Sequence, residues 1–90
     1  MEKEIIIKQL TPEEIKELGV ESWPIWTKEV SDFDWEYFGT EECYILEGEV
    51  TVTTANGEYH IKAGDFVRFP DGLKCHWNIT KDIRKHYRFV

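Results

Sequence analysis

Several residue types are scarce in this chain of 90 residues, and each scarcity excludes a class of protein. Two cysteines are too few for a disulfide framework, so we expect a reduced, cytoplasmic compartment. No apolar run approaches the ~18 residues that a membrane-spanning helix needs, so we expect no membrane partner. The first residues, MEKEIIIKQL, lack the basic start and long apolar block of a signal peptide.

Positive charge is also scarce, and it is unevenly placed along the chain. Residues 1–49 hold 14 acidic and 4 basic side chains, whereas residues 50–90 hold 4 acidic and 7 basic ones, and the net charge is −7. Because binding to phosphates requires clustered lysine and arginine, we expect no nucleic-acid partner. Glutamate and lysine are abundant while glutamine and asparagine total three, a composition typical of heat-loving organisms.

Aromatic residues, in contrast, are plentiful: the chain has four Trp, four Tyr and five Phe. Each aromatic side chain buries a large apolar area, so a chain of this length can build a small core without disulfides. We therefore expect one domain over residues 1–90.

One short helix is predicted between Thr11 and Gly19. Thr11 and Glu14 have the spacing of a capping box, Pro12 suits the first helical position, and Gly19 is a stop signal. The segment 23–30 that follows carries two of the tryptophans, including Trp26, and is expected to lie against the body of the domain.

The rest of the chain has the spacing of short strands, and helix content should be minimal. Turn signals delimit predicted strands at 4–8, 33–38, 42–47, 49–54, 58–62, 66–69, 74–80 and 83–89, with a hairpin turn at 55–57. Many short strands separated by frequent turns predict an all-β fold, either a sandwich or a barrel.

The order of these turn residues resembles the two sequence motifs of cupins. The first motif, at about 33–50, contains the stretch YILEGEV, and the second, at about 64–79, contains the spacing Gly-x₅-Pro-x-Gly-x₂-Cys. Four stretches resemble a subgroup of small single-domain, RmlC-like cupins: 23–26, 43–48, 75–77 and 85–87. That subgroup is related to the ureidoglycine aminohydrolase and ethanolamine-utilisation cupins, and its members mostly have no assigned function. The resemblance implies a jelly-roll β-barrel with a pocket at one end.

Metal-binding cupins place His-x-His before the motif glutamate, here Glu41, and another His after the Pro-x-Gly turn. By the shorter spacing of the family, the first two positions fall on Trp35 and Tyr37. By the longer spacing they fall on Asp34 and Glu36. We prefer the shorter spacing, because its residues belong to the aromatic side of the strand, which should face inward.

The later histidine position of the family is Cys75, so Glu41 alone remains of the four ligands. A first-row metal requires about three or four converging ligands, so we expect neither a metal nor another cofactor. The alternative is a site made of Glu41, Cys75 and one recruited histidine. His60, His76 and His86 are instead expected to be surface or hydrogen-bonded side chains.

Strand alternation predicts a cavity in which aromatic walls surround a carboxylate and a thiol. The candidate catalytic residues are Glu41 and Cys75, and the candidate ligand-binding residues are Trp26, Trp35, Tyr37, Cys43, Trp77 and Lys85. Lys85 shares a strand face with apolar residues, so it either points inward towards Glu41 or lies outside on an edge strand. The opposite register would place Arg84, His86 and Arg88 inside.

Three functions fit these residues. The first is a metal-independent module that binds a small metabolite in the aromatic pocket. The second is an isomerase, epimerase or C–N hydrolase with Glu41 as acid or base and Cys75 as nucleophile or proton donor. The third is a structural or interaction protein whose pocket is filled core. The apolar EIIIK strand either pairs within the chain or serves a homodimer. We rank the binding module first.

Overall fold

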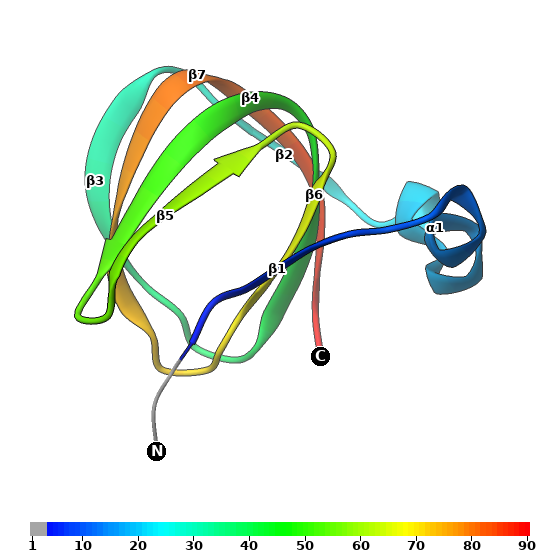
Figure 1. The fold of residues 1–90 in the computed structure, drawn as a ribbon, viewed down its shortest axis with the longest axis horizontal. Coiled ribbons are helices and arrows are strands. Elements are labelled where there is room, and N and C mark those ends of the chain that lie inside the picture. Colours follow the sequence, from blue (N-terminus) through cyan, green and yellow to red (C-terminus); the bar gives the residue numbers. More distant parts are fainter. Residues whose placement is uncertain (1–3) are drawn as a thin grey trace.

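The structure is a computed structural model that describes residues 4–90, and antiparallel strands curl into a barrel (Figure 1). Two long neighbouring strands, β4 and β7, form its frame. The strand order is β1-β6-β4-β7-β2, with β3 also paired to β7 and β5 to β4. The elements are β1 (Ile6–Gln9), α1 (Pro12–Leu18), the 3-10 turn η1 (Val20–Ser22), β2 (Ile25–Lys28), β3 (Ser31–Glu36), β4 (Glu41–Thr54), β5 (Gly57–Lys62), β6 (Asp65–Phe69) and β7 (Lys74–Phe89). The all-β prediction with one short helix is confirmed. Within residues 4–90, no helix has the length and apolar character needed to span a membrane.

The long strands β4 and β7 each join two segments that the sequence predicted as separate strands. In β4 the predicted break is Gly48, which instead forms an irregularity where the pairing with β7 shifts register. Gly48 has a φ of 100°, and a Cβ at this position would lie 2.2 Å from the carbonyl oxygen of Asp82. Gly48 therefore bends a continuous strand instead of ending it, because glycine alone tolerates this backbone and this close approach.

The segment after the helix forms a strand, β2, where the sequence had indicated only a segment lying on the body of the domain. Pro24 precedes the strand, and its carbonyl accepts a hydrogen bond from the backbone N–H of Tyr87 at 3.0 Å. The antiparallel pairing of β2 with β7 then places Trp26 opposite Lys85. This pairing brings a tryptophan from early in the chain to the interior of the barrel.

Helix α1 has the predicted ends and stands beside the barrel (Figure 1). Thr11 and Glu14 form both hydrogen bonds of the capping box, and Gly19 ends the helix at a φ of 68°. The helix itself buries no residue fully, and it packs with a small satellite cluster of Val20, Trp23 and Phe66.

The first strand and the predicted hairpin both pair within the chain. β1 pairs with β6 of the same chain over Ile6–Gln9, slightly later than predicted. The hairpin turn leaves Ala55 and Asn56 between the paired residues Thr54 and Gly57, as predicted.

The main core lies inside the barrel, on the inward faces of the long strands. Its buried members alternate along β4 and β7, which is the pattern of strands with one face inward. They include Cys43, Ile45, Val50 and Val52 from β4, and Cys75, Trp77, Ile79 and Ile83 from β7. The same alternation directs Glu41 and Lys85 inward among apolar neighbours.

Candidate functional site

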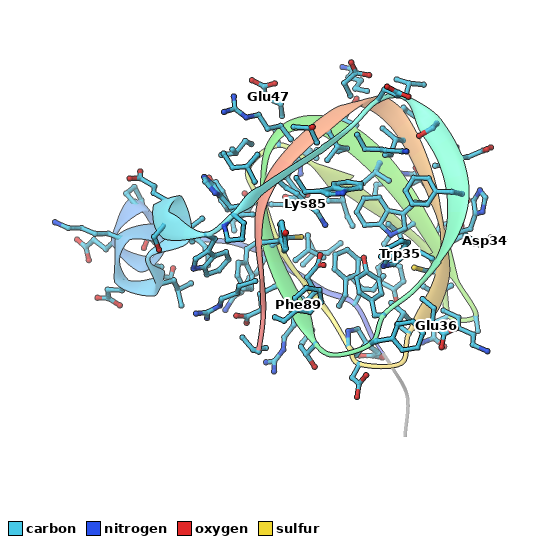
Figure 2. All side chains as sticks on the ribbon, turned by 180° about the vertical axis from the view of Figure 1, so that it is seen from behind. Asp34, Trp35, Glu36, Glu47, Lys85 and Phe89 are labelled. Atoms are coloured by element: carbon cyan, nitrogen blue, oxygen red, sulfur yellow. The ribbon has the colours of Figure 1, made fainter. Side chains whose placement is uncertain are left out.

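A cavity of about 240 Å³ lies inside the barrel, and seven aromatic side chains, one carboxylate and one ammonium line it. Six of the predicted site residues line this cavity: Trp26, Trp35, Tyr37, Glu41, Trp77 and Lys85. Three further lining residues were not singled out from the sequence: Phe33, Tyr87 and Phe89. Figure 2 shows Lys85, Trp35 and Phe89 on the inside, while Asp34 and Glu47 point away from the barrel.

The alternation along β3 determines which of its residues reach the cavity. Trp35 and Tyr37 line it, in agreement with the shorter motif spacing. Asp34 and Glu36 do not line it, and the Asp34 side chain is 93% exposed. Tyr37, just after the strand, lies over Phe69 with ring centroids 4.7 Å apart and an interplanar angle of 9°.

A buried ion pair lies among the aromatic walls of the cavity. Lys85 Nζ donates to Glu41 Oε2 at 2.8 Å, and the two side chains are 6% and 9% exposed, respectively. Of the two orientations that the sequence left open for Lys85, the structure has the inward one. An isolated charge in such surroundings costs several kcal/mol, and here each charge is compensated by the other.

The ammonium of Lys85 also lies over aromatic rings. Its Nζ is 5.0 Å from the ring centroids of both Trp26 and Trp77, and 5.8 Å from that of Phe69. The electron-rich faces of these rings attract the ammonium. Lys85 is therefore a fixed cation at the cavity wall, held by one carboxylate and three rings.

Two polar groups on the cavity wall are neutral hydrogen-bonding groups. Burial raises the pKa of the Tyr37 phenol, the negative charge of Glu41 raises it further, and the phenol stays protonated. The Trp77 side chain offsets this shift slightly, but its indole N–H makes no hydrogen bond of ordinary geometry within residues 4–90. The cavity wall thus adds the neutral phenol of Tyr37 to one balanced pair of charges, whereas the indole N–H of Trp77 is itself buried.

The two cysteines lie away from the cavity lining. Cys43 is fully buried behind it, and burial raises its thiol pKa to about 12. Cys75 lies opposite Trp35 in the sheet and borders a separate depression, together with side chains such as Asp34 and Lys74. Its S–H donates to the carbonyl of Trp35 at 3.7 Å, and burial raises its pKa to about 11. The predicted catalytic residues Glu41 and Cys75 are therefore not brought into one cavity, and a raised pKa disfavours a nucleophilic thiolate.

The residues present do not fit a metal ion of the kind that metal-binding cupins hold. Nowhere in residues 4–90 do three His, Cys, Asp or Glu side chains converge with a geometry suited to a metal. Glu41 is already neutralised by Lys85, and the indole of Trp35 cannot be a ligand.

The three histidines have other partners. His60 Nδ1 lies 3.0 Å from the hydroxyl of Thr51, His76 Nδ1 lies 2.8 Å from Asp34, and buried His86 Nδ1 lies 2.9 Å from the carbonyl of Trp23. None of these nitrogens faces Glu41.

The antiparallel barrel, with Glu41 pointing inward at the start of the long strand β4, agrees with the cupin motifs in the sequence. The chain belongs to the family of EutQ-like cupin domains, whose profile matches residues 15–87. The resemblance inferred from the motifs is thereby confirmed.

Solved structures agree with this assignment. A DUF861 family protein from Thermotoga maritima is 56% identical with a TM-score of 0.94, over 97% of this chain and 100% of that chain. The EutQ protein of Clostridium difficile is 18% identical with a TM-score of 0.65, over 92% of this chain and 64% of that chain. A cupin superfamily protein from Desulfitobacterium hafniense is 14% identical with a TM-score of 0.59, over 100% of this chain and 80% of that chain. A comparison with curated proteins gives no match.

Proposed function

We propose that this protein is a metal-independent binding module that holds one small organic molecule in the aromatic cavity. The observation that supports this most strongly is the Glu41–Lys85 pair at the cavity wall. Replacing a buried ion pair by apolar residues is often neutral or stabilising, so stability alone gives little reason for such a pair in a small barrel. Ion pairs that also face a cavity can instead orient a ligand.

The volume of the cavity limits the size of the ligand. Ligand pockets for drug-sized molecules commonly have volumes of about 300–1,000 Å³. The cavity here measures about 240 Å³, so it suits a molecule built around a single ring. Mostly apolar walls with a few fixed polar groups are typical of such pockets.

Binding ranks above catalysis because of the positions of the two proposed catalytic groups. Glu41 is engaged by Lys85, and the thiol of Cys75 borders a different depression. An enzyme would have to use Glu41 and Lys85 without Cys75, and these two groups are already bonded to each other.

Thermal unfolding in the presence of single-ring compounds tests the proposal. A ligand at 100 times its Kd stabilises the folded state by about 2.7 kcal/mol, which raises the Tm by several degrees in a domain of this size. The proposal predicts such an increase for at least one compound, and the same increase after treatment with a chelator. A stoichiometric transition metal bound through Glu41, detected by elemental analysis and lost in Glu41→Gln, would falsify the metal-independent part.

We further propose that the protein acts in the cytoplasm, where its two free, buried cysteines stay reduced. A homodimer is the proposed assembly, since cupin relatives often associate. Light scattering coupled to size-exclusion chromatography tests it, and a mass equal to one chain would contradict it.

A further inference from the structure

The Glu41–Lys85 pair has hydrogen-bonding capacity that the barrel leaves unused. The bond between them takes one ammonium hydrogen of Lys85 and one carboxylate oxygen of Glu41. An ammonium has three hydrogens and a carboxylate has two oxygens. Residues 4–90 supply no hydrogen bond to the second oxygen of Glu41 or to the remaining hydrogens of Lys85. A donor and an acceptor therefore lie side by side on the cavity wall.

The charges on this wall cancel. Glu41 carries one negative charge, Lys85 carries one positive charge, and the phenol of Tyr37 is neutral because its pKa is raised by burial. A ligand with a net charge would leave one charge uncompensated among aromatic side chains, which is costly. The cavity therefore favours a ligand that is neutral overall.

The aromatic faces that attract cations are already used by the protein itself. Trp26 and Trp77 both lie 5.0 Å from the ammonium of Lys85. A cationic ligand would have to compete with Lys85 for these two faces, at the side of the cavity where Lys85 would repel it. Phe33 is likewise engaged, by the ammonium of Lys28 at 5.6 Å. The walls formed by Trp35, Tyr87 and Phe89 remain available to stack on a flat ring.

On these grounds we infer that the cavity selects a neutral, planar ring with a cyclic amide edge, in which N–H and C=O are adjacent. The ring N–H donates to the second oxygen of Glu41, and the ring carbonyl accepts from Lys85. The ring itself lies between the remaining aromatic walls. This inference rests on the proposed function and adds the chemical class of the ligand.

Binding of 2-pyridone tests this inference, with N-methyl-2-pyridone and toluene as matched compounds. N-Methyl-2-pyridone keeps the ring and the carbonyl but loses the donor, and toluene keeps only a flat ring. A hydrogen bond to a charged group contributes enough that we expect 2-pyridone to bind at least about tenfold more tightly than its N-methyl form. Calorimetry measures the two affinities, and the ring signals of the cavity aromatics in NMR spectra locate the ligand.

The double variant Glu41→Leu/Lys85→Met removes both charges together, so that neither is left alone. The affinities for 2-pyridone and its N-methyl form should become about equal, while toluene binding is retained. The matched control is Glu49→Leu/Lys81→Met, which removes an exposed ion pair of 3.2 Å outside the cavity lining. This control should keep the full preference.

A second measurement serves if the double variant does not fold. In the unmodified protein with ¹³C-labelled lysine, 2-pyridone should shift the Cε signal of Lys85, and N-methyl-2-pyridone at equal occupancy should shift it less.

The outcomes separate the two levels of the hypothesis. Toluene binding without a preference for 2-pyridone overturns the amide-edge inference and leaves the binding module intact. The inference is also overturned by a preference that persists in the double variant, or by tighter binding of benzoate, benzylamine or zwitterionic phenylglycine. If no compound, toluene included, perturbs the cavity signals, the proposed function fails as well.

Discussion

Two buried carboxylates, Asp65 and Glu41, lie in different parts of the barrel and have different surroundings. Asp65 is 1% exposed at the start of β6, and both of its oxygens accept hydrogen bonds, from the Gln9 amide and from the backbone and side chain of Lys62. Glu41 is 7% exposed at the start of β4, and one of its oxygens is bonded to Lys85 beside a cavity.

The difference separates a structural carboxylate from a candidate site. Asp65 connects β1, β5 and β6, and both of its oxygens already have partners within the protein. Within residues 4–90, Glu41 has one side-chain partner, and both ions of the pair line the cavity. Burial alone therefore does not mark a candidate site, whereas burial with an oxygen that lacks a partner beside a cavity does.

The largest expected effect comes from breaking the pair in the cavity. Lys85→Met leaves Glu41 as an uncompensated buried charge, so the free energy of unfolding should fall by about 3–5 kcal/mol. The double variant Glu41→Leu/Lys85→Met should recover most of this loss, because no charge is left alone. Urea unfolding followed by tryptophan fluorescence measures both values. A double variant as unstable as the single one would show that the pair is needed for the fold itself.

The matching change at the other carboxylate is Asp65→Ala, which leaves the backbone N–H of Lys62 without its acceptor. We expect the free energy of unfolding to fall by about 1–3 kcal/mol. No second substitution of a side chain should rescue this loss, because the orphaned donor belongs to the backbone. Toluene affinity should be unchanged, and a fall in it would contradict the purely structural role of Asp65.

The thiols provide a pH-dependent test of how well the interior around Glu41 is shielded from water. The thiol pKa is raised from an ordinary value of 9.0 to about 12 for Cys43 and about 11 for Cys75. A group with a raised pKa in the folded state stabilises that state fully below the ordinary pKa, and this contribution is lost as the pH rises through the folded value. The free energy of unfolding should therefore decrease from about pH 9 towards pH 12.

Chemical unfolding at a series of alkaline pH values measures this decrease. The variant Cys43→Ala/Cys75→Ala should show a shallower decrease over the same range, with the remainder arising from buried Tyr37. An identical slope in the variant would mean that the thiols ionise as readily in the folded state as in the unfolded one.

The smallest effect on stability is expected at the rim of the cavity. Trp35 lines the cavity but is 52% exposed, so Trp35→Ala should lower the free energy of unfolding by no more than about 1 kcal/mol. The affinity for toluene should nevertheless fall by about tenfold through loss of ring contact. Phe38→Ala is the control, because Phe38 is 83% exposed and does not line the cavity. Equal affinities for both variants would remove Trp35 from the binding site.

Much of the fold follows from local signals. The capping box of α1 and the hairpin turn before Gly57 depend on neighbouring residues, and both appear as predicted. Two expectations were wrong. A strand was predicted to end at Gly48, where β4 continues, and no strand was predicted at the position of β2. A glycine can either end a strand or bend it, and the choice depends on the approach of Asp82 from the partner strand.

The candidate site was predicted less completely than the fold. Alternation predicted that Glu41, Trp35, Tyr37 and Trp77 share one side, and all four line the cavity. The same reasoning grouped Cys75 with them, although its thiol borders another depression. The cavity lining also includes three aromatic residues that strand alternation had not been used to place: Phe33, Tyr87 and Phe89.

The sequence by itself determined the all-β class, the single capped helix and an inward-facing glutamate, because periodicity, caps and turn residues act over a few neighbours. The tertiary structure alone decided the partner of that glutamate, since Glu41 and Lys85 are 44 positions apart and meet through the pairing of β4 with β7. It also decided that two tryptophans, Trp26 and Trp77, enclose the ammonium. Strand registers are set by the packing of the whole core, and no local pattern specifies which charges that packing brings together.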